Sequence, residues 1–389
     1  MTYCIGWKTG GAIIIAADTA ITSDERGAVP GNVQHSSFGE PHIRQNGEVV
    51  EERGLKIYRF ENMLLTFAGS TTVAHEVSKA IRRDLNIGVR PREAVKMAVG
   101  VNVNPGDSRI QLISAFNEGQ DRILLSFNAN GDEQFVDEPN LVQFGSAPEP
   151  IKDCTRNLLT QLTPYSGTAE QRTAELLGAL QTYGMTMSMM TVGVGGAYVG
   201  AYLDESGTHW QKDIVFIVNR DDLSYSPLVS TCVRDDMLVI SSPAYRASKA
   251  LANFTSDQLT GQTTVERCMW AVREGRLQHN RGKFDFIVVI NGEFPIVTVV
   301  EMKRKLKHDL IWVMPSVTPT GTALAFHLAP RLRHLRDYPA MNGSGNPVPT
   351  LNFVGYQKPS GQCSISAALG RSTRHHETAR GDMIRRSLY

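Results

Sequence analysis

The sequence predicts an α+β fold in which two antiparallel sheets pack face to face and helices cover them. Aliphatic segments of strand length, separated by glycine- and asparagine-containing turns, predict the strands. Apolar residues at every fourth position, namely Val73, Val77, Ile81 and Leu85, predict an amphipathic helix. Along the first 220 residues the order is strands, two helices, strands, two helices, strands. Two packed sheets flanked by helices satisfy that order, because each element then buries its apolar face.

The chain opens with a predicted hairpin. Its strands are residues 3–9 and 11–18, with glycines at the turn. Residues 20–52 are polar and contain glycine, so we expect a long loop or insertion there. Two short aliphatic strands are then expected within residues 55–68.

Two pairs of helices are expected in this half of the chain. Pro91 suits the first turn of a helix and predicts the second member of the first pair. The second pair is expected at 151–162 and 169–183, and further strands at 109–116, 122–128, 141–144, 192–203 and 210–219.

The pattern changes near residue 220, and we expect a separate C-terminal α/β region of unknown role over residues 225–370. The predicted domain boundaries are therefore 2–220, 225–370 and a basic, flexible tail at 371–389. Within the second region we expect strands at 237–241, 284–290 and 296–302 and helices at 244–253 and 265–278.

Composition and charge limit the classes of function. The 389 residues carry 40 Lys and Arg against 39 Asp and Glu, a formal net charge of +1, so no nucleic acid and no membrane partner is expected. A hydrophobic share of 41% is that of a globular protein. The apolar run 12–17 is too short for a secretory signal. Residues 176–203 carry no charge, but their six glycines favour a buried helix end and strand over a membrane span.

Five widely spaced cysteines predict neither a zinc site nor a disulfide framework. A reducing, cytoplasmic location is the simplest interpretation. Cys4 is near the N-terminus, where a nucleophile is one alternative, but a buried cysteine in a first strand is far commoner.

The candidate nucleophile is Thr2. Threonine is small, so removal of Met1 is expected to leave Thr2 with a free α-amine. A terminal threonine supplies both nucleophile and base, because its own amine takes the proton of the hydroxyl. The alternative is that a Met-Thr start means nothing for function.

The block from Gly6 to Thr19 favours the catalytic interpretation of Thr2 over the alternative. It resembles the opening hairpin of proteasome β-type subunits, which are N-terminal-nucleophile (Ntn) hydrolases, and of the bacterial peptidases related to them. Thr2, Gly6 and Asp18 fall at the places of the family pattern without a gap. The resemblance covers roughly residues 2–217. Weaker matches follow at Lys56-Ile57, at residues 67–71, at residues 144–147 and at Gly195-Gly196.

The resemblance implies an αββα four-layer sandwich and a role for five residues. Thr2 would be the nucleophile, and Lys56 beside it would lower the cost of proton transfer. Asp18 would pair with Lys56 and hold it in place. The backbone N–H of Gly69 would form the oxyanion hole, and Ser146 would bond the Thr2 amine. The implied chemistry requires neither a cofactor nor a metal.

The implied function is threonine-type hydrolysis of peptide bonds, through an acyl ester on Thr2, in a homo-oligomer acting on peptide or unfolded-protein substrates. Two departures leave an alternative open, a catalytically inactive proteasome-like scaffold or binding protein with the C-terminal half as effector. Thr191 and Val194 stand where the family has an aspartate and a serine. The Asp18–Lys56 interval is also about twenty residues longer than usual.

A third possibility is a metal-dependent nuclease in the C-terminal half. Asp285, Glu301 and Lys303 have the loose spacing of such a core, in which carboxylates hold Mg²⁺ and the lysine orients a water. The alternative is a half-exposed strand with alternating polar positions.

Overall fold

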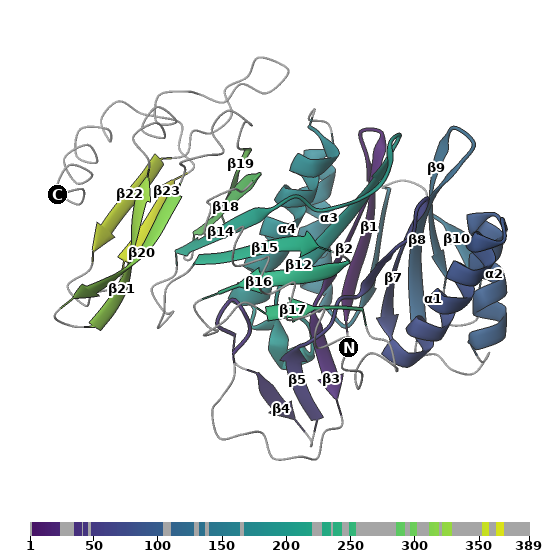
Figure 1. The fold of residues 1–389 in the computed structure, drawn as a ribbon, viewed down its shortest axis with the longest axis horizontal. Helices are drawn as coiled ribbons and strands as arrows, with labels where there is room; N and C mark the ends of the chain where they lie inside the picture. The colour runs from purple at the N-terminus through teal and green to yellow at the C-terminus, as the bar shows by residue number, and fades with distance from the viewer. Residues whose placement is uncertain are drawn as a thin grey trace.

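The computed structural model shows an arrangement of antiparallel sheets with four α-helices among the residues it describes (Figure 1). The described residues are 2–23, 35–40, 42–45, 48–103, 110–127, 132–136, 140–163, 167–219, 228–234, 236–242, 249–253, 285–291, 296–301, 311–318, 321–328, 352–357 and 363–368.

The first sheet has five strands in the order β11-β1-β2-β12-β13. Their bounds are β1 Tyr3–Thr9, β2 Ala12–Asp18, β11 Leu141–Gly145, β12 Tyr198–Asp204 and β13 Gly207–Trp210. Cys4 pairs with Ala17 in the predicted opening hairpin, which is confirmed. β2 is buried along its whole length, because β1 and β12 flank it and other layers cover both faces.

The second sheet also has five strands, in the order β10-β9-β8-β7-β6. Their bounds are β6 Ile57–Arg59, β7 Met63–Gly69, β8 Ile110–Glu118, β9 Asp121–Phe127 and β10 Glu133–Phe135. Alternate residues of β7 point to opposite faces, as a strand requires. Leu64 therefore lies in the core between the two sheets with Ile5 and Ile15, whereas Leu65 and Phe67 lie in a second core.

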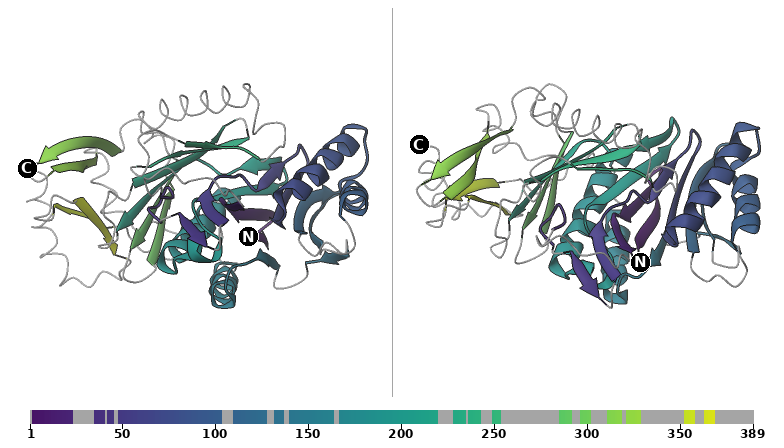
Figure 2. Two further views of the ribbon diagram at one scale, coloured as in Figure 1. Left: turned by 90° about the horizontal axis from the view of Figure 1, so that it is seen from below. Right: turned by 60° about the horizontal axis from the view of Figure 1, so that its bottom comes forward.

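Helices cover the faces turned away from the space between the sheets. Helices α1 (Thr71–Asn86) and α2 (Pro91–Asn102) share the second core with β7 and β8. Helix α4 (Ala169–Thr186) packs on β2 and β12, and α3 (Glu149–Leu162) contacts α4. Figure 2 shows α1 and α2 on the side opposite α4. All four helices occur where the sequence predicts them.

The segment expected to be a long loop forms a small sheet instead. Strands β3 (Ala20–Ser23), β5 (Glu48–Glu52) and β4 (Ile43–Gln45) pair in the order β3-β5-β4. The segment is rich in polar residues, and Ala20 of β3 is opposite Glu52 of β5 at the far end of the segment, so no local pattern predicted the sheet. β3 follows directly on β2, so this sheet extends from the end of the hairpin that carries Asp18 (Figure 1).

Two predicted strands have different bounds. Residues 193–197 are a turn after the 3₁₀ helix Met189–Val192, because glycines at positive φ interrupt the extended backbone before β12. The predicted strand 210–219 is split between β13 and β14 (Ile214–Asn219), which belong to different sheets. The buried Gln211 between them accepts a bond from Gly200 N–H and donates one to Thr231.

β14 belongs to a six-stranded sheet in the order β17-β16-β15-β14-β18-β19. The other bounds are β15 Leu228–Arg234, β16 Met237–Ser241, β17 Lys249–Leu251, β18 Phe286–Asn291 and β19 Ile296–Glu301. β18 and β19 pack on α4, on which β2 and β12 also pack. This explains the uncharged stretch of 176–203, since α4 is buried by sheets. No helix among the described residues has both the length and the apolar character that a membrane span requires.

The predicted helix over 244–253 is wrong where the structure describes it. Residues Lys249–Leu251 of this segment form strand β17, which pairs with β16. Tertiary contacts therefore override the local preference of these residues for helix. Two hairpins complete the described elements: β20 Ile311–Thr318 with β21 Gly321–Leu328, and β22 Asn352–Gln357 with β23 Cys363–Ala368. The predicted helix 265–278 and tail 371–389 lie outside the described residues.

Candidate active site

Asp18 is the centre of the candidate site. It is the last residue of β2, and its side chain is 0% exposed. Its Oδ1 accepts hydrogen bonds from Lys56 Nζ at 2.8 Å and from Tyr3 N–H at 2.9 Å. Its Oδ2 accepts bonds from Ala20 N–H and Gly195 N–H. Strands from both halves of the opening hairpin, the β6 segment and the Gly-Gly turn therefore meet at one carboxylate.

Lys56 immediately precedes β6, and it is also 0% exposed. Burial lowers the pKa of its ammonium, while the nearby carboxylate of Asp18 acts to raise it. The predicted Asp18–Lys56 pair is present as a buried ion pair. A buried charge is tolerated only when it is paired, so each of these two residues fixes the other.

Thr2 precedes β1 and is 2% exposed. Its carbonyl oxygen accepts a hydrogen bond from Ser146 N–H at 2.8 Å. The N–H that follows Thr2, that of Tyr3, bonds the same Asp18 oxygen as Lys56 Nζ. Because two donors on one oxygen atom lie close together, the Lys56 ammonium lies next to the backbone that carries Thr2.

Ser146 follows β11, which pairs with β1 so that Tyr3 is opposite Gly145. The Ser146 residue is exposed, and its N–H bonds the Thr2 carbonyl. Gly145 makes this approach possible, since a Cβ there would lie 1.7 Å from the Thr2 oxygen. The turn that the sequence singled out is therefore in direct contact with Thr2.

Gly69 ends β7 with a φ of +113°, and Ser70 then caps helix α1. β6 pairs with β7 so that Ile57 is opposite Thr66, and the Thr66 hydroxyl donates to the Lys56 carbonyl. Gly69 thus lies three residues after Thr66 on β7, the strand whose Thr66 hydroxyl bonds the Lys56 carbonyl. This register places it near the site, and its role as an oxyanion-hole donor is a proposal.

Sequence reasoning missed two carboxylates of the inserted segment. Glu40 accepts a bond from Gly196 N–H at 3.2 Å, and Glu52 accepts one from Ala197 N–H at 2.6 Å. Together with Asp18 on Gly195, three buried carboxylates hold three successive N–H groups. The signal was the Gly195-Gly196 pair itself, because backbone N–H groups buried in an irregular turn need acceptors.

The two departures from the family pattern lie beside this turn. Thr191 is exposed and its hydroxyl bonds the Ser188 carbonyl, whereas Val194 is fully buried. Neither supplies a carboxylate. Glu40 and Glu52 provide buried carboxylates next to the turn instead.

Cys4 lies on β1, where Asp18 and Lys56 act on it electrostatically, and it is a fully buried core residue. Burial raises the pKa of its thiol to about 12, so the thiolate is not formed near neutral pH. Burial also raises the pKa of Cys232 to about 12, whereas Cys154 on α3 is exposed.

Iodoacetamide is therefore expected to alkylate native protein at Cys154 and to leave Cys4 and Cys232 unmodified until denaturant is added. Peptide mass spectrometry measures the extent at each position. Alkylation of Cys4 at the rate of Cys154 would contradict the burial that defines this part of the site.

The nuclease pattern is only partly described. Asp285 lies beside Asp213, whose N–H donates to it at 3.3 Å, and Arg234 forms a two-pronged ion pair with Asp213. Glu301 pairs through its backbone with Phe286 on the neighbouring strand. Lys303 lies outside the described residues, so the nuclease hypothesis stays untested.

No protein-family model and no curated protein matches the chain. Among solved structures, a Gly-1 mutant of Anbu from Hyphomicrobium sp. strain MC1 is similar at 14% identity and a TM-score of 0.38, over 55% of this chain and 85% of that one. Eukaryotic HslV from Trypanosoma brucei is similar at 16% identity and a TM-score of 0.36, over 52% of this chain and 100% of that one.

Proposed function

We propose that this protein is a threonine-type Ntn hydrolase with an αββα core, in which Thr2 attacks peptide bonds. The observation that carries the proposal is the buried Asp18 carboxylate, which bonds both Lys56 Nζ and the N–H following Thr2. A buried lysine beside a candidate nucleophile is an arrangement that perturbs proton transfer, and such perturbed groups gather at functional sites.

The proposed reaction requires cleavage of the bond before Thr2, which frees its α-amine. The Thr2 hydroxyl oxygen then attacks the substrate carbonyl carbon, and the hydroxyl proton passes to the α-amine. The proton moves on to the leaving nitrogen as the C–N bond breaks. The acyl ester left on Thr2 is hydrolysed by water, which restores the hydroxyl.

The neighbouring groups have distinct roles in this proposal. The Lys56 ammonium favours the developing negative charge on the Thr2 oxygen, as a nearby cation does. The Gly69 N–H stabilises the oxyanion, where a preorganised donor contributes about 2.7–4 kcal/mol. Ser146 orients the amine. A homo-oligomeric assembly and a peptide or unfolded-protein substrate are part of the same proposal.

The experiment is intact-mass spectrometry before and after a threonine-directed β-lactone or epoxyketone. We expect loss of Met1 and a single adduct, and no adduct on Thr2→Ala. Thr9→Ala is the matched control, because Thr9 is a buried threonine at the far end of β1, the strand that follows Thr2. It should be labelled like the unchanged protein.

Three results would contradict the proposal. Retention of Met1, or no adduct on a processed Thr2, would favour the inactive scaffold. Equal labelling of Thr2→Ala would place the reactive group elsewhere in the chain.

A further inference from the structure

The six-stranded sheet reaches the backbone on both sides of Lys56. Asn253 follows β17, and its side-chain amide donates to the Leu55 carbonyl at 3.0 Å and to the Ile57 carbonyl at 2.7 Å. Leu55 N–H in turn donates to the Ala252 carbonyl. One side chain, 196 residues along the chain from Ile57, therefore bonds the carbonyls before and after Lys56.

The Lys56 carbonyl itself is held from the other direction. It accepts a bond from the Thr66 hydroxyl of β7 at 2.9 Å. β6 is the edge strand of its sheet, with β7 as its one partner there. Residues 252–253 contact the Leu55–Ile57 backbone that leads into β6, so three successive carbonyls around Lys56 have defined donors.

Further contacts hold the six-stranded sheet to the rest of the site. The Ser242 hydroxyl donates to the Ser37 carbonyl, and Ser37 donates twice to Glu52, which holds the Gly-Gly turn. Phe38 of the inserted segment packs edge-on against Phe216 of β14, with ring centroids 5.3 Å apart.

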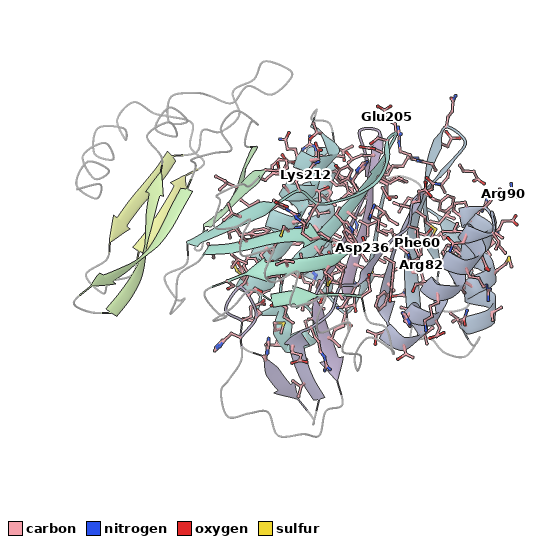
Figure 3. All side chains as sticks on the ribbon, in the orientation of Figure 1. Phe60, Arg82, Arg90, Glu205, Lys212 and Asp236 are labelled. Atoms are coloured by element: carbon pink, nitrogen blue, oxygen red, sulfur yellow. The ribbon has the colours of Figure 1, made fainter. Side chains whose placement is uncertain are left out.

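The β15–β16 hairpin makes a further contact with the last residues of β13 and β6. Its Asp236 accepts bonds from Trp210 Nε1 at 2.7 Å and from Arg59 Nε at 3.3 Å. Figure 3 labels Asp236, Phe60 and Arg82 close to one another in its view.

We propose that Asn253 is a positioning residue for Lys56, so that the six-stranded sheet completes the site of the proposed hydrolase and is not an independent effector. This inference rests on the proposed function for its catalytic meaning. The physical reason is that Lys56 has to meet Asp18 without water, and a buried lysine stays in place only if its backbone is held. A displacement of about 1 Å in such a group costs on the order of a hundredfold in rate.

The test compares Asn253→Ala with Trp210→Phe. The second variant removes one bond between the same sheet and β13 but leaves the Lys56 backbone untouched. Two readouts are used: the rate of Thr2 acylation by the β-lactone across pH, and the pKa of Lys56 followed by NMR in lysine-labelled protein. The second readout needs no activity.

We expect Asn253→Ala to slow acylation at least about tenfold, since part of the positioning is lost. We also expect the pKa of Lys56 to rise, because water reaches the ammonium and relieves the burial that lowers it. Asp18 on β2 and Cys4 on β1 are the titratable groups that act on Lys56, and neither is changed. Trp210→Phe should alter neither readout.

The inference is overturned if Asn253→Ala leaves the rate and the Lys56 pKa unchanged. It is equally overturned if both variants slow acylation by the same factor with an unchanged pKa, which a general loosening of the sheet produces. Should Asn253→Ala fail to fold, Asn253→Leu keeps a similar size, removes the donors without adding a charge and is judged by the same criteria. If the unchanged protein is not labelled at all, the proposed function fails, and the Lys56 pKa still decides the positioning role.

Discussion

Replacing Asp18 with asparagine is expected to abolish acylation of Thr2 and to lower the free energy of unfolding by about 3–5 kcal/mol. The asparagine keeps the shape of the side chain but removes the charge that pairs with Lys56 at 2.8 Å. Breaking one partner of a buried ion pair leaves an uncompensated charge, and that accounts for the cost. The amide also replaces an acceptor oxygen by a donor among N–H groups that need acceptors, including those of Tyr3 and Gly195.

Chemical denaturation measures the stability and intact mass measures the acylation. Glu93→Gln is the control for loss of a carboxylate, because Glu93 pairs at the surface with Arg90, which is labelled in Figure 3. Exposed pairs contribute about 0–1 kcal/mol, so this variant should be close to the unchanged protein.

The double variant Asp18→Asn/Lys56→Met separates stability from chemistry. Asp18→Asn alone leaves the buried Lys56 charge without its partner. The double variant removes that charge as well, so part of the lost stability should return. Acylation should not return, because the cation beside Thr2 is missing. Unchanged stability of Asp18→Asn alone would contradict the central place of this carboxylate.

Local patterns predicted much of the framework. The hairpin of β1 and β2 is indicated by two segments of strand length around a glycine turn, and α1 by the four-residue spacing of its apolar face. Pro91 marks the start of α2 correctly. These elements are set by residues near one another in sequence, which explains why reading the sequence alone finds them.

The errors share a physical cause, which is pairing between distant segments. β17 has the composition of a helix, yet it pairs with β16 and the chain then reaches Leu55. β14 looks continuous with β13, yet it pairs with β15 and, in parallel, with β18. Propensity is a weak guide where such contacts decide the conformation.

The residues of the candidate site likewise divide into those that the sequence predicted and those that it did not. The resemblance supplied Thr2, Asp18, Lys56, Gly69 and Ser146. In the structure Lys56 bonds Asp18, Ser146 N–H bonds the Thr2 carbonyl, and the N–H of Tyr3, which follows Thr2, bonds Asp18. The resemblance had no means of supplying Glu52 or Asn253, because the site backbone groups that they bond, at Ala197 and at Leu55 and Ile57, are at least 145 residues away in the sequence. A side chain that acts on backbone leaves no spacing motif.

Substituting Gly145 by alanine is expected to displace Thr2, because Gly145 packs against the Thr2 backbone from the β11 turn. Gly145 has a φ of +106°, which L side chains rarely adopt, and the added Cβ would lie 1.7 Å from the Thr2 carbonyl oxygen. The conformation costs about 1–2 kcal/mol. Moving the backbone to relieve the overlap costs about 1–3 kcal/mol more. Both terms act where Ser146 N–H bonds Thr2.

Gly88→Ala separates these two terms. Gly88 also has a positive φ, +85°, but nothing lies within 4 Å of its added Cβ. It should show the conformational cost alone and leave acylation of Thr2 unchanged. Thermal and chemical unfolding measure both variants, and the labelling rate is compared between them.

The displacement of Thr2 is the part of this prediction that bears on function. A shift of about 1 Å in the nucleophile is expected to slow acylation on the order of a hundredfold, even in the fraction of protein that remains folded. If Gly145→Ala and Gly88→Ala are equally stable and equally labelled, the β11 turn does not determine where Thr2 lies. The nucleophile would then be held from the Asp18 side alone, through the bond from Tyr3 N–H.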